Sequence, residues 1–133
     1  MAVIRQRRRT CKQDVPAAGQ EPALYACVWD HIADTPTRLD AANGRGPHET
    51  AVRVMKIAEE AGEAVAAYIG LNGANPRKDV TATPDELAGE LCDVVLAALI
   101  ALATVTGGTP QAESRLAAHV AARATRLRAL PAA

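Results

Sequence analysis

The longest apolar stretch in this 133-residue chain is the ten-residue run 94–103. A helix that crosses a membrane needs about 20 apolar residues, so this run predicts a helix buried in a protein core, and no membrane partner is expected. Hydrophobic residues make up 49% of the chain but aromatic residues only 2%, so alanine and aliphatic side chains must build that core. Alanine favours helices over strands. The sequence therefore predicts an all-α fold in which helices pack on helices.

Turn signals divide the chain into four predicted helices. Glycine and proline in the stretch 43–47 predict a break, and the polar stretch 72–79 predicts an exposed loop. The helices are expected to cover residues 22–39, 49–70, 84–106 and 109–128. Together they form one domain, residues 21–130, because 133 residues leave no room for a second independent core.

The third helix has the most complete start signal. Thr83 is a suitable N-cap, Pro84 suits the first helical position, and Glu86 completes a capping box. The glycine pair 107–108 should end this helix. Residues 109–110 repeat the threonine-proline pattern, so this threonine is expected to cap the fourth helix.

Residues 1–20 form a basic tail in front of the domain, since five of the 15 lysines and arginines lie within residues 5–12. We interpret the tail as a solvated, disordered terminus and expect no nucleic-acid partner, with binding of nucleic acid through the arginines as the alternative. No apolar segment follows the charges, so the tail does not resemble a signal peptide.

The three cysteines, Cys11, Cys27 and Cys92, have unrelated spacings and include no CxxC pair. They predict neither a disulfide framework nor a zinc site. A reducing, cytoplasmic compartment is therefore the expected localisation.

Acidic residues form one group in the second predicted helix and another in the third. Glu60 and Glu63 are three residues apart, and so are Glu90 and Asp93, so each pair lies on one face of its helix. The second pair stands among apolar residues, where a charge is costly unless it is paired.

The two groups meet if the helices pack antiparallel. Glu63 lies seven residues before the end of the second helix, and Glu90 lies six residues after the start of the third. Both are then about 10 Å from the connecting end at ~1.5 Å per residue, and Glu60 and Asp93 match at the next turn. Four carboxylates at one place would repel one another strongly unless a divalent cation neutralised them.

Ligands that are all oxygens select a hard ion such as Mg²⁺ or Mn²⁺. A di-iron bundle is disfavoured, because it requires a histidine three residues after a glutamate and none of the three histidines has that spacing. The other interpretation is that these acids are surface charges paired with Arg53, Lys56 or Arg77.

The segment 59–63, with the sequence EEAGE, and the segment 90–93, with the sequence ELCD, are separated by 26 residues. This arrangement resembles the EExxE…ExxD signature of the MazG-like nucleotide pyrophosphohydrolases. That all-α superfamily includes dimeric dUTPases, dCTP pyrophosphatases and phosphoribosyl-ATP pyrophosphohydrolase. Lys56 is similar to a lysine that family members carry before the glutamates. The likeness is strongest over residues 49–102.

The resemblance implies a MazG-like four-helix fold and Mg²⁺-dependent hydrolysis of a nucleoside triphosphate to a monophosphate and pyrophosphate. It assigns four carboxylates to the Mg²⁺ ion: Glu60, Glu63, Glu90 and Asp93. Mn²⁺ could take the place of Mg²⁺ there. Glu59 would bind a second ion or orient the nucleophile. Lys56 would contact phosphate, with an ion pair to Glu60 as its alternative role.

Members of the family often carry a lysine and an arginine on the last helix that help to hold the phosphates. The candidates in this chain lie on the predicted fourth helix and in the loop 72–79: Arg123, Arg126, Arg77 and Lys78.

The run 94–103 is apolar at every position, whereas a helix with one side in water should carry a polar stripe. A homodimer or homotetramer is therefore expected to cover it, as the resemblance also implies. A function of another class would be a non-catalytic helical interaction or regulatory module. The intact set of five acids argues against that alternative.

Overall fold

The computed structural model describes residues 21–129, and within them it contains four α-helices and no strand. The helices are α1 (Glu21–Asn43), α2 (Pro47–Leu71), α3 (Pro84–Thr106) and α4 (Thr109–Arg128). The all-α prediction is confirmed, and so is the break at 43–47. The predicted basic tail, residues 1–20, lies outside the described residues.

The capping box at the start of α3 is confirmed. The Glu86 amide donates to the Thr83 hydroxyl at 3.2 Å, and the Thr83 amide donates to the Glu86 carboxylate at 2.7 Å. Gly107 ends the helix with φ 87°, a left-handed conformation that suits glycine. The predicted cap of α4 is wrong, because the N-cap is Gly108 and Thr109 is already helical.

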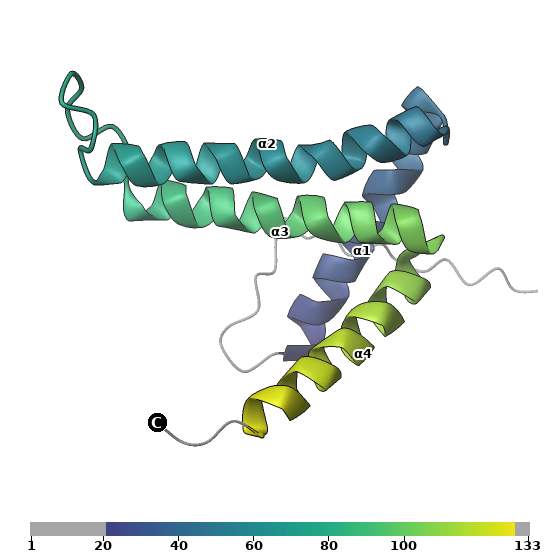
Figure 1. The fold of residues 1–133 in the computed structure, drawn as a ribbon. Helices are drawn as coiled ribbons and strands as arrows, with labels where there is room; N and C mark the ends of the chain where they lie inside the picture. Colours follow the sequence, from purple (N-terminus) through teal and green to yellow (C-terminus); the bar gives the residue numbers. More distant parts are fainter. Residues whose placement is uncertain (1–20, 130–133) are drawn as a thin grey trace, which may run out of the picture.

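α2 and α3 run side by side as a long antiparallel hairpin joined by the loop 72–83 (Figure 1). α1 and α4 cross α3 near its C-terminal end, and the half of the hairpin next to the loop has neither helix beside it (Figure 1). α1 extends four residues beyond the expected end at Leu39 and continues through Pro36.

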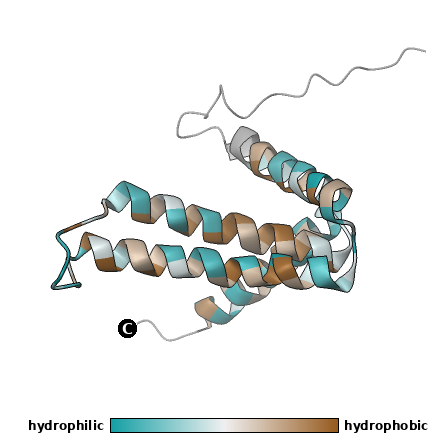
Figure 2. Ribbon diagram, turned by 90° about the horizontal axis from the view of Figure 1, so that it is seen from above, coloured by the Kyte–Doolittle hydropathy of each residue, from teal (hydrophilic) through white to brown (hydrophobic). Residues whose placement is uncertain are grey.

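The small core lies where α1 and α4 pack on α3. It consists of Trp29, Ile32, Ala103 and Ala112, with partly buried aliphatic residues around it. The expectation that the run 94–103 is buried is only partly met, since Ala97, Ala101 and Ala103 are buried but Val95 is 57% exposed. Figure 2 shows apolar residues along both helices of the hairpin.

By length and composition alone, α3 could cross a membrane. Only 17% of its most apolar 18-residue segment is buried. A core helix of a soluble protein passes the same test, and α3 carries Glu90 and Asp93, which are costly in lipid.

A buried ion-pair network ties α1, α2 and α3 together. Arg53 is only 5% exposed and donates to Glu49 at 2.9 Å, Asp40 at 2.8 Å and the Thr104 hydroxyl at 3.1 Å. The exposed Arg45 also pairs with Asp40, at 2.6 Å. The hydrogen bond from Arg53 holds the pKa of Asp40 below its usual value. The sequence interpretation missed this network, although the i,i+4 spacing of Glu49 and Arg53 was a signal for one of its pairs.

Cys92 is free and exposed.

Candidate metal and phosphate site

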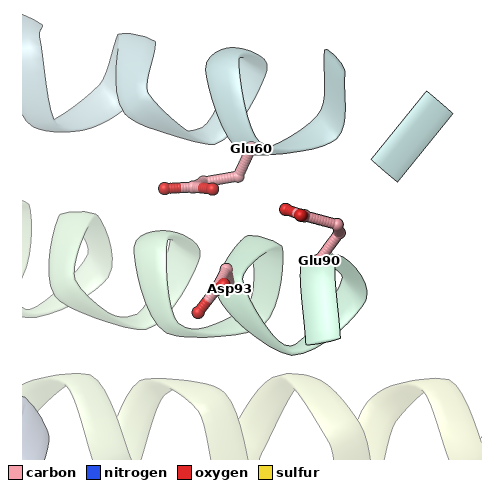
Figure 3. Close-up of side chains that lie close together, drawn as sticks. All are labelled: Glu60, Glu90 and Asp93. Atoms are coloured by element: carbon pink, nitrogen blue, oxygen red, sulfur yellow. The ribbon is translucent and has the colours of Figure 1, made fainter. Parts of the chain in front are cut away.

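Three carboxylates from the two helices of the hairpin lie close together. One oxygen each of Glu60, Glu90 and Asp93 lies within 4.8 Å of the other two. Glu60 comes from α2, and Glu90 and Asp93 come from adjacent turns of α3 (Figure 3). The antiparallel match of Glu60 with Asp93, expected from counting residues along the helices, therefore agrees with the structure. We refer to these three residues as the acidic cluster.

Glu63 does not belong to the acidic cluster but lies next to it. The pKa of Glu63 is raised, mainly by the charge on Glu60. A hydrogen bond to Glu60, burial and the charge on Glu90 raise it further, in decreasing order. The structure thus brings together three of the four predicted metal ligands and leaves the fourth, which is exposed, at the edge.

Lys56 lies between two of the acids. Its ammonium is 2.8 Å from Glu60 and 2.9 Å from Glu59. The hydrogen bond to Glu60 is the main cause that raises the pKa of Lys56, and the hydrogen bond to Glu59 is the second. The hydrogen bond between Lys56 and Glu60 also lowers the pKa of Glu60. The alternative role of Lys56, an ion pair with Glu60, is therefore present in the structure. Glu59 is 58% exposed and is held by its ion pair with Lys56.

The chemistry and spacing of the acidic cluster fit a small divalent cation. Mg²⁺ binds oxygens at about 2.0–2.1 Å, so two ligands on opposite sides of one ion lie about 4.2 Å apart. The oxygens of the cluster are within 4.8 Å of one another, so small side-chain rotations are enough to bring them to that separation. The Glu60 side chain is only 12% exposed, which limits competition from water.

The four candidate phosphate contacts do not lie in the cluster. Arg77 and Lys78 are exposed in the loop 72–83, in a turn where the Arg77 amide donates to the Asn75 side chain at 3.1 Å. Arg123 and Arg126 lie on the C-terminal half of α4, which diverges from the hairpin (Figure 1). The loop adjoins the end of the hairpin that carries Glu63 and Glu90, whereas α4 begins at the opposite end, after the C-terminus of α3.

Comparison of the chain with protein-family models found no match, and neither did comparisons with curated proteins and with solved structures.

Proposed function

We propose that this protein is a Mg²⁺-dependent nucleoside triphosphate pyrophosphohydrolase with a MazG-like fold. The observation that carries the proposal is the closeness of the Glu60 carboxylate, on α2, to those of Glu90 and Asp93, on the antiparallel α3. Three carboxylates so close together are costly without a cation, and the motif that supplies them resembles the EExxE…ExxD signature.

In this proposal the acidic cluster holds Mg²⁺, with Glu63 as a further ligand after a side-chain rotation. The ion supplies neutralisation of the triphosphate and of the charge that develops on the phosphoryl oxygens. Mn²⁺ meets the same ligand requirements.

The protein's own groups bind and orient the reactants. Lys56 contacts a phosphate oxygen, which releases Glu59 from its ion pair. The Glu59 carboxylate then orients a water molecule and accepts its proton. The water oxygen forms a bond to the α-phosphorus while the bond from that phosphorus to the bridging oxygen breaks, and pyrophosphate leaves. Arg77 and Lys78, in the loop that joins α2 to α3, are further cations for the departing charge.

A second copy of the chain is the proposed partner, in a dimer or a tetramer built from two dimers. The exposed apolar residues of the hairpin recur at helical steps on α2 and on α3 and form one face of it: Val54, Val65, Ile69, Leu91, Val95 and Val105. Leu96 of α3, which packs against the core, lies about 100° or more round the helix from Leu91 and Val95. Two such faces packed together bury both stripes, as a two-fold interface requires.

The experiment that tests the proposed function is turnover of a panel of canonical and modified nucleoside triphosphates with Mg²⁺. Glu90→Gln and Asp93→Asn should each remove most of the activity, because they delete a ligand charge without changing shape. Asp30→Asn, on the exposed surface of α1, is the matched control and should leave the activity unchanged.

Thermal unfolding of the same variants tests the metal separately. Mg²⁺ should raise the Tm of the wild type and of Asp30→Asn, but not that of Asp93→Asn. Full activity in excess EDTA would refute the metal requirement. A Mg²⁺-dependent rise in Tm without turnover of any nucleotide would instead favour the non-catalytic helical module.

A further inference from the structure

A cavity of about 370 Å³ lies where the C-terminal half of α1 meets the start of α2, the end of α3 and the start of α4. This volume is within the range of roughly 300–1,000 Å³ found for small-molecule sites. Nothing in the proposed reaction so far uses this cavity. Its lining combines charged residues, threonines and small apolar residues, among them Asp40, Arg45, Arg53, Thr37, Thr104 and Ala103.

The charges of the cavity are already paired with one another. Arg53 is bonded to both Asp40 and Glu49, and Arg45 is paired with Asp40. Two arginines and two carboxylates leave no net charge, so the cavity favours neither a free anion nor a cation. An electrically neutral ligand can enter the cavity without the free-energy cost of moving an unpaired charge out of water.

Hydroxyl groups and small apolar surfaces make up most of the remaining lining. Four threonines line the cavity, together with Ala33, Pro36 and Ala103: Thr37, Thr50, Thr104 and Thr109. The Thr37 hydroxyl donates to the Ala33 carbonyl at 2.9 Å, so its oxygen can accept a hydrogen bond from a ligand. A neutral ring system with several polar groups, such as a nucleobase and its sugar, matches this lining.

The cavity and the acidic cluster lie along one stripe of the hairpin. On α2, Arg53 and Glu60 are seven residues apart, with Lys56 between them, and on α3 Asp93 and Thr104 are eleven residues apart. Both separations are within about 20° of whole helical turns, so the residues of each pair face the same side. Arg53 and Glu60 are about 10 Å apart along the axis, which an extended nucleoside triphosphate spans.

We propose that this cavity holds the base and sugar of the nucleotide whose phosphates bind at Lys56 and the acidic cluster. The inference rests on the proposed function, since it assigns a subsite to the same substrate. No aromatic residue lines the cavity. The planar guanidinium of Arg45, whose side chain is 80% exposed at the rim, is therefore the group that can stack on the base.

Binding of free nucleosides tests the cavity without any catalysis. Adenosine, guanosine, cytidine, uridine and thymidine are titrated into the full chain in EDTA and followed by amide chemical shifts. At least one nucleoside should shift the amides of Thr37, Thr104 and Thr109 before those of Glu90 and Asp93. The inference fails if none shifts the three threonines at millimolar concentration, or if the shifts centre elsewhere.

Variants then separate the nucleoside end of the substrate from the phosphate end. Thr37→Val and Arg45→Gln should each raise the KM for the nucleotide roughly three- to tenfold, the effect of one or two lost polar contacts. The constant for inhibition by tripolyphosphate, which has no base, should stay unchanged. Thr125→Val and Arg38→Gln are the matched controls, since neither residue lines the cavity.

The outcomes distinguish the two proposals. Equal KM values in cavity variants and controls, with normal turnover, would overturn the cavity assignment and leave the proposed function intact. Threonine shifts with a nucleoside but no hydrolysis of its triphosphate would support the cavity as a nucleoside site and overturn the proposed reaction. A parallel loss of nucleotide and tripolyphosphate binding would count against the cavity.

Discussion

The Lys56 ammonium lies 2.8 Å from a carboxylate oxygen of Glu60, a member of the acidic cluster. The lysine thus partly neutralises the residue on which the proposed metal depends. A cation that binds Glu60 competes with Lys56, and a phosphate group that attracts Lys56 makes room for that cation. Metal and triphosphate are therefore expected to bind together.

Replacing Lys56 by methionine should separate these two effects. Without the ammonium, Glu60 faces Glu63 and Glu90 unpaired, so the Tm in EDTA should fall and the rise in Tm caused by Mg²⁺ should grow. Turnover should fall, because a phosphate contact is lost. Thermal unfolding with and without Mg²⁺, next to Lys78→Met as a control, measures this. An unchanged response to Mg²⁺ would show that Lys56 does not compete with the metal.

The raised pKa of Glu63 gives a pH dependence to the metal-free protein. Its pKa lies above the ordinary value of 4.5, mainly because of the charge on Glu60. A carboxyl that holds its proton more tightly in the folded state destabilises the protein at neutral pH, and this cost disappears as the pH falls through its folded pKa. In EDTA, Glu63→Gln should therefore have a higher Tm than the wild type at pH 7, with a difference that shrinks toward pH 4.5. A constant or reversed difference would contradict this.

The buried network around Arg53 should matter more for stability than its exposed counterpart. Arg53→Met leaves Glu49 and Asp40 without their buried partner, and breaking such a pair costs about 3–5 kcal/mol. Arg45→Gln removes a pair whose arginine is 80% exposed, so it should cost less than about 1 kcal/mol. Urea unfolding of the two variants compares them directly, and equal losses would mean that Arg53 is not held as described.

Local signals and residue counts predicted much of the fold and part of the site. Thr83, Pro84 and Gly107 mark the ends of α3 by chemistry that depends only on neighbouring residues, so these ends were correct. The meeting of Glu60 with Asp93 followed from two helix lengths and one loop. The Arg53 network could not be foreseen as a whole, because it requires α1, α2 and α3 to meet at one point.

Other features depend on rotation and packing that residue counts do not contain. Glu63, which matches Glu90 by residue count, lies beside the cluster and not in it. The apolar residues of α2 include Val54, Met55 and Val65, all exposed in the single chain. Whether α3 or a second copy covers such residues depends on packing that residue counts do not contain.

Assembly in solution tests that apolar face. Light scattering should give about twice or four times the chain mass of 13.9 kDa. Val95→Glu, in the middle of the face, should shift the protein toward a monomer because it buries an unpaired charge in the proposed interface. Val120→Glu, exposed on α4, is the control and should leave the mass unchanged. A wild-type mass near 14 kDa in an active sample would refute the dimer.

The products of the reaction test the central claim most directly. A nucleoside triphosphate that the protein turns over with Mg²⁺ should be followed by ³¹P NMR from the first turnovers. The account predicts monophosphate and pyrophosphate in equal amounts, with no diphosphate accumulating, and loss of both products in Asp93→Asn. Orthophosphate and a nucleoside diphosphate as the primary products would mean hydrolysis at the terminal phosphate and would contradict the account.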